Sequence, residues 1–404
     1  MKGKALFCFF ILVAIQLSIS AATNVTDDIK QDTTWALTSS PHYIMNDVEV
    51  KENSTLTIEP GVQVHFNGSY RLDIEGALIA EGNSISLIEF ISSGGGEVYI
   101  EYTSTGGNNN LSYCRFNNTR LEAYESSVDI RDSVFHDSDM EIRSGNFTMY
   151  ISNNTFTNCG SNAIMRGIFP DKHIYVTQNE FNNCTPELRG REETASYVYF
   201  SNNTVQGSAY GAAVMGWTHA SYNTFHNNTY GVDINDAYGE VNLSHNLIYN
   251  NSIGIYVEDM VDGGVVSYNT ITLNNIGIFV NEYLGVYSYN NLHDNFDYGV
   301  RAIDIEHSMP SEEIMMIHNW WGTDEKHDID EYIYDYYDDA GLPEVVYDPY
   351  LNTFVCEAPI LEPIADADCD GAVSDFELLG YIVLWNQGEV DDFDLLNAID
   401  AWAS

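Results

Sequence analysis

Basic residues are scarce in this chain. Fifteen lysine and arginine residues stand against 60 aspartate and glutamate residues, which gives a formal net charge of −45 over 404 residues. A surface of this sign repels phosphate backbones and anionic lipid headgroups, and it attracts cations. The composition therefore argues against nucleic-acid binding. It predicts cation binding only where carboxylates are placed together.

An apolar run long enough to span a membrane is also lacking. The one apolar run, ALFCFFILVAIQLSIS, follows Lys2 and Lys4 and leads into small residues up to Ala22. It is about 15 residues long, shorter than the roughly 20 that span a bilayer. This pattern is typical of a signal peptide, which we place at residues 1–22. We expect a secreted protein, extracellular or at the cell surface, without membrane insertion.

Cysteine is sparse, with five residues beyond the signal peptide: Cys114, Cys159, Cys184, Cys356 and Cys369. No CxxC or Cys/His spacing indicates zinc, whereas an exported chain retains disulfides, so two bridges and one free thiol are possible. Sequons of the N-x-[ST] type occur about a dozen times and predict a glycoprotein in a host that glycosylates. They include Asn24, Asn53, Asn67, Asn146, Asn153, Asn183, Asn227 and Asn250.

Asparagine, in contrast, recurs with a period. Segments such as SNNTF, SYNTF, SHNLI and SYNTI each place an asparagine two positions before an apolar residue. These asparagines are Asn154, Asn179, Asn203, Asn223, Asn246, Asn269, Asn290 and Asn319. Their separations are 25, 24, 20, 23, 23, 21 and 29 residues, which is too variable for a helical repeat of rigid geometry.

Each repeat also holds a second short stretch that begins with glycine, as in GVDI, GIYV, GIFV and GVRA. Alternating β-branched and aromatic residues predict strands, and Gly and Asn between them predict turns. A unit this small cannot bury its apolar face alone, so successive units must stack. The sequence therefore predicts an all-β, parallel β-helix of roughly eleven or twelve coils, whose stacked asparagines hydrogen-bond about 4.8 Å apart.

Other repeat positions carry matching residues. Cys159 and Cys184 each lie five residues after a repeat asparagine, so they face each other as a disulfide or as two stacked small side chains. Several tyrosines in neighbouring coils fit either rung packing or stacking on sugar rings. They are Tyr222, Tyr256, Tyr268, Tyr283, Tyr287 and Tyr289.

Three segments resemble the right-handed parallel β-helix repeat proteins of the pectate-lyase-like superfamily. They are the opening LTIEPGVQVHF…LDIEGALIAEG…IEF, the repeated S-x-N-x-[FI]…NN…G-[IV] and the ending NWWGTDEKHDIDEYIYDYYDDAGLPEVVYDPYL, within about residues 40–351. The resemblance implies a secreted bacterial or archaeal β-helix. It further implies that the segment after NWWGT closes the last coil, where DIDEYIYDYYDD has the pattern of a short capping helix.

Many proteins of this fold are polysaccharide lyases, hydrolases or epimerases, so the fold does not decide the activity. The few arginines in the repeats, Arg166, Arg189, Arg191 and Arg301, lie in no lyase signature, and polygalacturonase-type elements are absent.

One constellation stands out from the background. Five residues after successive repeat glycines come four acids: Asp236, Asp259, Glu282 and Asp304. In register they form a column that holds cations or protons, with Asn235, Glu258 and Asn281 as further oxygen ligands and Arg301 as a base or sugar clamp. The alternative is a row of solvated acids at a turn.

The carboxy-terminal segment changes character. DADCDGAVSDFE has the ligand spacing of an EF-hand loop, with Asp366, Asp368, Asp370, Ser374 and Glu377 supplying side-chain oxygens and Ala372 its carbonyl. VSDFELLGYIVLW recurs seventeen residues later as VDDFDLLNAIDAW. The pair resembles a dockerin, the duplicated calcium module that binds cohesin domains. The second half departs from the pattern, because Val383 and Trp385 stand where its first two ligands belong.

Together these features predict a signal peptide (1–22), a β-helix with capping segments (23–351), a linker (352–365) and a dockerin-like Ca²⁺ module (366–404). Cys356 and Cys369 bracket the linker, and a bridge between them would tie the module to the end of the β-helix. We expect a surface protein that binds polysaccharide and docks to a cohesin-like or other extracellular protein. The alternative is a carbohydrate-active enzyme, a lyase, epimerase or hydrolase, acting on acidic glycans.

Overall fold

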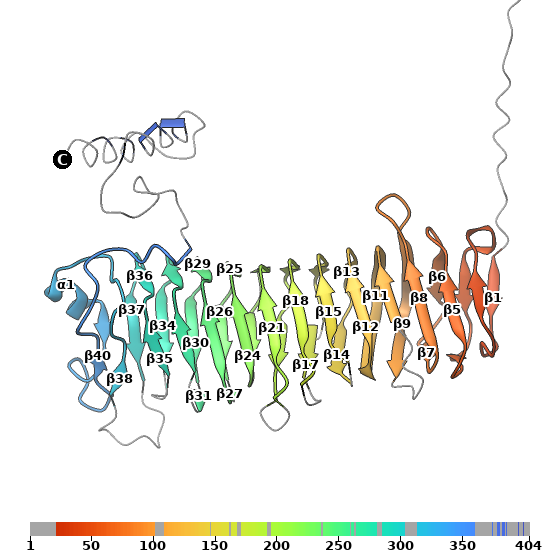
Figure 1. Cartoon of the computed structure of the whole chain (residues 1–404), viewed down its shortest axis with the longest axis horizontal. Helices are drawn as coiled ribbons and strands as arrows, with labels where there is room; N and C mark the ends of the chain where they lie inside the picture. The colour runs from red at the N-terminus through yellow and green to blue at the C-terminus, as the bar shows by residue number, and fades with distance from the viewer. Residues whose placement is uncertain are drawn as a thin grey trace, which may run out of the picture.

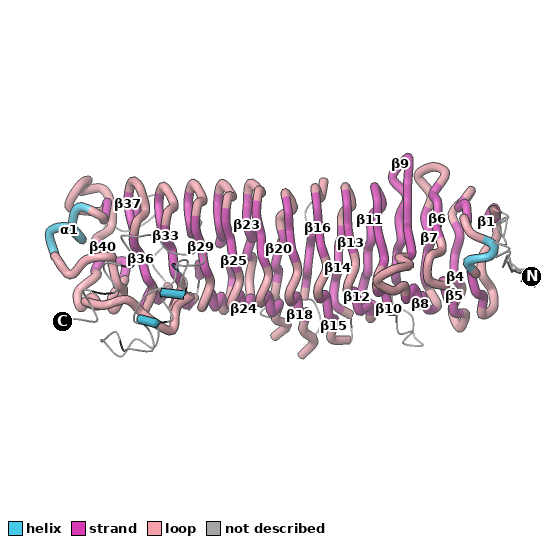
Figure 2. The backbone as a smooth tube through the Cα atoms, turned by 90° about the horizontal axis from the view of Figure 1, so that it is seen from above, coloured by secondary structure: helices cyan, strands magenta, loops and turns pink. Residues whose placement is uncertain are grey.

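The computed structural model describes residues 22–101, 109–145, 147–160, 163–167, 171–191, 195–235, 237–258, 260–261, 264–280, 285–303 and 313–359, with 374, 378–379, 382–383, 385, 395 and 399. Coils follow one another in chain order along a rod (Figures 1 and 2). The strands form three columns along the rod, which we call sheets I, II and III.

Sheet III is a separate sheet of twelve strands. Its strands are β2 (Thr33–Trp35), β5 (Thr55–Ile58), β8 (Ala77–Glu81), β10 (Asn109–Ser112), β12 (Val128–Arg131), β15 (Met149–Ser152), β18 (Ile174–Thr177), β21 (Val198–Ser201), β24 (Thr218–Ser221), β28 (Val241–Ser244), β32 (Val265–Ser267) and β35 (Val286–Ser288). Twelve strands, one per coil, confirm the expected number of coils.

Sheets I and II join into one 24-stranded sheet, because two long strands, β9 (Ile88–Glu101) and β11 (Cys114–Ser126), run through both. Sheet I also contains β1 (Thr23–Val25), β3 (His42–Ile44), β6 (Gln63–Phe66), β13 (Val134–His136), β16 (Thr155–Thr157), β19 (Glu180–Asn182), β22 (Thr204–Gln206), β25 (Thr224–His226), β29 (Leu247–Tyr249), β33 (Thr270–Thr272) and β36 (Asn291–His293). Sheet II also contains β4 (Val48–Val50), β7 (Arg71–Ile74), β14 (Met140–Ser144), β17 (Ala163–Arg166), β20 (Pro186–Arg189), β23 (Tyr210–Val214), β26 (Tyr230–Ile234), β30 (Ile253–Val257), β34 (Ile276–Val280), β37 (Tyr298–Ala302) and β39 (Ile333–Tyr334).

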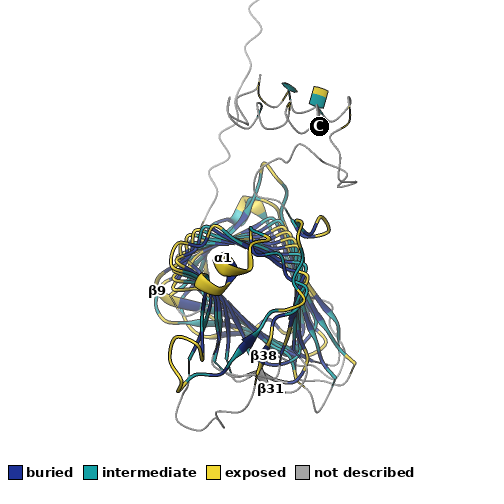
Figure 3. Cartoon of the chain, turned by 90° about the vertical axis from the view of Figure 1, so that its left-hand side faces the viewer, coloured by how far each residue is buried: buried dark blue, intermediate teal, exposed yellow. Residues whose placement is uncertain are grey.

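The pairing between coils is parallel, as in β15 with β18 and β26 with β30. Each coil passes from sheet III to sheet I and then to sheet II, and the three sheets surround one core (Figure 3). Short strands such as β5 and β12 alternate buried and outward residues, so one side chain in two enters the core. The strands predicted from the period-two alternation therefore form the wall of a right-handed parallel β-helix, as expected.

The core under sheet I contains a row of stacked phenylalanines. Phe90, Phe116, Phe135, Phe156 and Phe181 lie on consecutive coils, with ring centroids 4.6–4.9 Å apart. These five side chains are fully buried. The stack thus contributes to the lateral register of these coils, together with the backbone pairing of their strands.

The predicted asparagine ladder is confirmed at the corner between sheets III and I. Each amide Nδ2 from Asn154 to Asn290 donates to the Oδ1 of the next repeat asparagine, over 2.9–3.1 Å, and the ladder ends at Asn319. The same Oδ1 atoms accept the backbone N–H of the preceding asparagine. These bonds satisfy corner groups that water does not reach.

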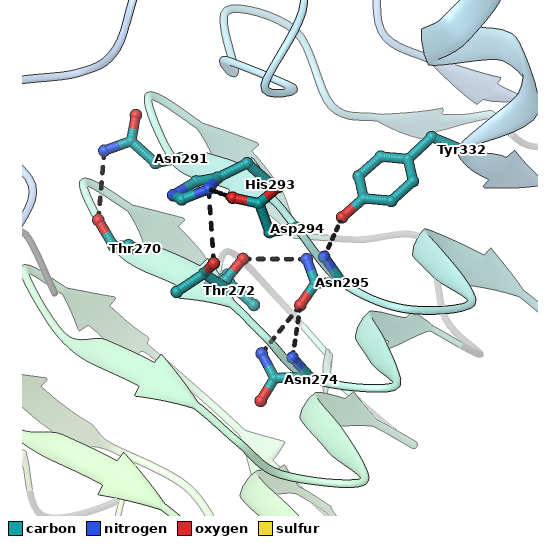
Figure 4. Close-up of polar contacts among 9 residues, drawn as sticks. Thr270, Thr272, Asn274, Asn291, His293, Asp294, Asn295 and Tyr332 are labelled. Carbon is teal, nitrogen blue, oxygen red and sulfur yellow. Dashed lines mark hydrogen bonds and ion pairs between the residues drawn. The ribbon is translucent and has the colours of Figure 1, made fainter. Parts of the chain in front are cut away.

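A second ladder, which we did not predict, lies five residues further on, at the corner between sheets I and II. Asn251 Nδ2 donates to Asn274 Oδ1, and Asn274 Nδ2 donates to Asn295 Oδ1, both over 3.0 Å. Figure 4 shows its end, where the Asn295 N–H donates to the Tyr332 hydroxyl over 2.6 Å. Earlier coils use Cys159 and Cys184 at this position, and these form a disulfide. Of the two arrangements expected for this pair, the disulfide is the one present.

The last coil is closed by α1 (Lys326–Glu331), which lies over the end of the rod (Figure 3). The predicted helix over 328–339 is wrong beyond Glu331. Ile333 and Tyr334 form β39 instead, because β37 would otherwise leave an unpaired strand edge. Ile333 pairs with Val300, and Tyr334 pairs with Arg301. Two small parallel pairs, β27 (Ala237–Tyr238) with β31 (Met260–Val261) and β38 (Ile314–Met315) with β40 (Val345–Val346), complete the strands.

The segment after the cap packs back on sheet I. The Val355 N–H donates to Asn291 Oδ1 over 2.7 Å, and Asn291 Nδ2 donates to the Val355 carbonyl over 3.0 Å. Val355 and Ala358 are buried. Cys356 is disulfide-bonded to a residue outside the described ranges. The linker therefore begins as an ordered strap on the rod.

Candidate functional site

The outer face of sheet II carries the charged and aromatic side chains that fit a ligand site. Its outward row runs through Asp73, Tyr99, Glu122, Glu141, Ile164, Glu187, Ala213, Asp233, Tyr256, Phe279, Arg301 and Tyr334. These residues come from consecutive coils, which lie about 4.8 Å apart. The amino-terminal part of this face is charged, and the carboxy-terminal part is aromatic.

In the charged part, arginines occupy one register position on three adjacent strands. Arg143 pairs with Arg166, and Arg166 pairs with Arg189, across β14, β17 and β20. Arg143 Nη2 lies 2.6 Å from Glu141 Oε1, and Arg189 forms an ion pair with Glu187. The carboxylates are nearly buried, so guanidinium groups form the accessible surface.

The charges in this part alter two carboxyl groups. Burial raises the pKa of Glu141, but the hydrogen bond from Arg143 and the charges of Arg166 and Arg120 outweigh it and hold this pKa below its usual value. Burial raises the pKa of Glu122 and outweighs the opposing Arg120 charge. Glu122 lines a hollow of about 220 Å³ together with Tyr99, Ala123, Tyr124, Glu141 and Arg143. A second hollow of about 440 Å³ lies beside Arg71 and Glu97 on the same face.

In the aromatic part, rings stack from coil to coil. Tyr210 stacks on Tyr230 with centroids 5.4 Å apart, and Tyr256 stacks on Phe279 at the same distance. The Arg301 guanidinium carbon lies 5.7 Å from the Phe279 centroid and 5.3 Å from the Tyr334 centroid. Because Tyr210 begins its stack and is 41% exposed, one of its ring faces is available to a ligand.

Asp233 is an acid among these aromatic residues. It is 5% exposed, and its Oδ1 has no hydrogen-bond partner. Burial, reinforced by the charge of Glu258, raises the pKa of Asp233 to about 6. A carboxyl group that titrates so near neutrality is suited to proton transfer and marks a candidate site.

Sequence reasoning missed Asp233, although a signal was present. The third residue of each glycine-initiated stretch points outward, and these residues are Asp233, Tyr256, Phe279 and Arg301. An acid in an otherwise aromatic and basic row was therefore visible in GVDI.

The predicted carboxylate column, Asp236, Asp259, Glu282 and Asp304, lies outside the described residues, as does Asn281. Its described neighbours do face each other, because Asn235 Nδ2 donates to Glu258 Oε2 over 2.7 Å. Arg301, the proposed base or clamp, instead packs over two rings, and its buried Nε has no hydrogen-bond partner.

The predicted tyrosines have different positions. Tyr222, Tyr268 and Tyr289 stack with His245 and His318 in an outer corner row, with centroids 4.9–5.5 Å apart. Tyr287 is fully buried in the core, and Tyr283 lies outside the described residues. Another outer stack, which the sequence did not suggest, runs through Tyr150, Tyr175, Tyr199 and His219 on sheet III. Since stacked rings cover each other's faces, sugar stacking is limited to the ends of these rows.

Calcium ligation is predicted for the carboxy-terminal loop, of which only Ser374 is described. Its carbonyl accepts the Leu378 N–H over 3.0 Å, a spacing typical of a helical turn. Asp366, Asp368, Asp370, Ala372 and Glu377 lie outside the described residues. Within the described ranges, no group of three or more His, Cys, Asp or Glu side chains is placed to hold a metal ion. In those ranges no helix is both long and apolar enough to cross a membrane.

The fold is a right-handed parallel β-helix with charged and aromatic side chains on the outer face of sheet II. Residues 190–319 match the model of the family described as "Right handed beta helix region". Among solved structures, the periplasmic alginate epimerase AlgG is similar, at 16% identity over 78% of this chain and 74% of that chain, with a TM-score of 0.35. A single-substitution mutant of AlgG matches at 15% identity over the same shares, with a TM-score of 0.32. No curated protein matches this chain. Values this low carry no information on activity.

Proposed function

We propose that this protein is an exported rod that binds polysaccharide along the outer face of sheet II. The observation that carries the proposal is the row of outward side chains from β7 to β39, which are charged or aromatic except at Ile164 and Ala213. The row is roughly 50 Å long at about 4.8 Å per coil. An extended polymer with polar hydroxyls and apolar ring faces is complementary to such a row, because aromatic rings offer apolar contact and guanidinium groups donate hydrogen bonds.

The test is affinity electrophoresis against immobilised acidic and neutral polysaccharides. Tyr210→Ala removes the accessible end of an aromatic stack and is expected to weaken binding severalfold. Tyr150→Ala, at the exposed end of the stack on sheet III, is the matched control and is expected to bind as the wild type does. Equal mobility of the wild type in every gel and in a gel without polymer would contradict the proposal.

We further propose that the carboxy-terminal segment is a dockerin-like Ca²⁺ module that docks to a cohesin-like or other extracellular protein. The EF-hand spacing at Asp366, Asp368, Asp370, Ala372, Ser374 and Glu377 supports calcium binding. The bonded state of Cys356 supports its proposed bridge to Cys369, which would tie the module to the strap. Localisation at the cell surface or in an extracellular complex follows from docking and from the signal peptide.

Docking is tested by a pull-down with the full chain from envelope and culture-medium extracts, with and without chelator. The expected result is a partner that is lost on chelation and lost in Asp366→Ala/Glu377→Ala. A calorimetric titration that finds no calcium bound to the full chain would remove this part of the proposal, whatever the pull-down recovers.

Asp233 favours a second candidate function, a lyase or epimerase acting on acidic glycans. An acid with a pKa of about 6 is poised to transfer a proton near neutral pH, and it lies in the same row as Arg301. Lyase activity appears as ultraviolet absorbance of an unsaturated uronate, and epimerisation appears in the proton NMR spectrum of the polymer. Activity that survives Asp233→Asn would exclude this residue as the proton carrier.

A further inference from the structure

We infer that Arg166 is an anion subsite of the sheet II face, which takes a carboxylate or sulfate group of an acidic polysaccharide. The inference rests on the proposed polysaccharide binding and assigns its ligand class. Its basis is an imbalance in the Arg–Glu pattern of β14, β17 and β20.

Two of the three stacked arginines have a carboxylate on their own strand, two residues away on the same face. Arg143 forms an ion pair with Glu141, and its Nε donates to Glu141 Oε1 over 2.8 Å. Arg189 forms an ion pair with Glu187. On β17 the equivalent position is Ile164, which pairs in register with Glu141 on one side and Glu187 on the other. Arg166 therefore lacks the same-strand carboxylate of its neighbours.

The contacts of Arg166 reflect this difference. Its Nη2 lies 3.8 Å from Glu187 Oε1, an oxygen that already serves Arg189. The Nε atoms of Arg166 and Arg189 are both buried without a hydrogen bond of good geometry, but only the Nε of Arg189 lies in ion-pair contact with Glu187. The three stacked guanidinium groups thus share two carboxylates, and Glu141 also forms an ion pair with Arg120 over 2.9 Å. Like charges directly opposite each other on neighbouring strands destabilise a sheet, so an additional anion would be stabilised here.

The surroundings leave room for the sugar that carries the anion. The Arg166 side chain is 30% exposed, so part of the guanidinium group reaches solvent. The hollow beside Tyr124 and Arg143 begins one strand away, and the Arg143 guanidinium carbon lies 4.9 Å from the Tyr124 centroid. An oxyanion on Arg166 would place its sugar ring towards this hollow, against a tyrosine edge. In a chain of charge −45, this group of arginines lowers the repulsion that a polyanion would meet at the surface.

The experiment compares Arg166→Gln with Arg131→Gln, an exposed arginine on sheet III that gives the same change of net charge. Binding to polygalacturonate, dextran sulfate and neutral dextran is measured by affinity electrophoresis at low and high salt. Arg166→Gln is expected to weaken polyanion binding about tenfold and to leave dextran binding unchanged, because it removes charge-assisted hydrogen bonds. Arg131→Gln is expected to change neither. A loss confined to polygalacturonate assigns the site to carboxylate, and a loss confined to dextran sulfate assigns it to sulfate.

Equal polyanion binding by the two variants would overturn the subsite and leave polysaccharide binding intact. Wild-type protein that binds dextran but neither polyanion would do the same, whereas wild-type protein that binds no polymer at all would overturn the proposed function as well. Thermal unfolding checks that Arg166→Gln is folded. Arg166→Lys keeps the charge but loses the planar guanidinium group, and it is expected to give an intermediate loss of polyanion binding. If Arg166→Gln does not fold, Arg166→Lys decides the test: polyanion binding equal to that of the wild type would overturn the subsite.

Discussion

The two halves of the rod close their corners differently. From β16 onward, both corners that flank sheet I are occupied largely by asparagines, and each donates to its counterpart in the next coil. In the earlier coils, hydroxyl groups replace them: Ser133 Oγ accepts the Cys114 N–H, and Ser138 Oγ accepts the Thr119 N–H. Where β9 and β11 run continuously from sheet I to sheet II, the second corner has no separate turn at all.

The difference shows what makes a ladder propagate. An asparagine amide offers an acceptor and two donors, so it receives from one coil and gives to the next. A serine hydroxyl has one donor, and Ser133 uses it on the Arg131 carbonyl two residues back. The Ser133 hydroxyl therefore accepts from the preceding coil but donates within its own, so serine corners do not extend into a ladder. The phenylalanine stack runs through these coils and continues to Phe156 and Phe181.

The largest effect is expected from Phe135→Ala, in the middle of the phenylalanine stack. Removing a fully buried ring that contacts rings on both sides should lower the free energy of unfolding by about 4 kcal/mol. Urea titration measures the loss, and hydrogen exchange should place it in the coils around β13. Val134→Ala, on the same strand but partly exposed, is the control. A loss spread evenly over the rod would show that the halves do not differ in this way.

A smaller loss, about 3 kcal/mol, is expected from Asn269→Ala in the carboxy-terminal half. Asn269 is fully buried, donates to the Leu243 and Ser267 carbonyls and to Asn290, and accepts from Asn246, so the change leaves several buried groups without partners. Asn275→Ala, an exposed asparagine of the same coil, should cost less than about 0.5 kcal/mol. Similar losses for the two variants would indicate that the ladder contributes little.

Asp233→Asn should raise the stability at pH 7 by about 2 kcal/mol. The folded protein binds the Asp233 proton more tightly than the unfolded chain, since its pKa is raised to about 6. The wild type should therefore lose stability as the pH rises from about 4 to 6, and the variant should lack this slope. Parallel stability–pH curves for both proteins would contradict the raised pKa.

The smallest effects concern the outer corner row of tyrosine and histidine rings. Tyr268→Ala removes two ring contacts and should cost about 1 kcal/mol, whereas Tyr222→Ala removes one, at the 60% exposed end of the row, and should cost about half as much. Both residues have a positive φ, so the backbone penalty of the two changes is matched. Equal costs would mean that the rings do not stabilise one another.

Much of the wall could be predicted from the sequence. The spacing of Asn154 to Asn319 indicated the coils and the first ladder, and the shared position of Cys159 and Cys184 indicated their contact. The second ladder was missed because its asparagines stand in only four coils and give way to cysteine or serine in earlier ones. The capping helix was overextended because the apolar pattern of 328–339 does not reveal that β37 leaves an edge for Ile333 to pair with.

The sequence by itself determined the length of each coil and the position of its asparagine corners. Each corner amide must meet its counterpart one coil away, so the asparagines recur every 20–29 residues along the chain. Only the tertiary structure decided which outward residues share a face. Asp233 and Arg166 owe their surroundings to neighbouring strands of different composition. Repeat positions such as those of Asp233, Tyr256 and Phe279 indicate an outward row in the sequence. They do not show how buried each side chain is or which charges surround it, because no outward residue needs the same partner in every coil.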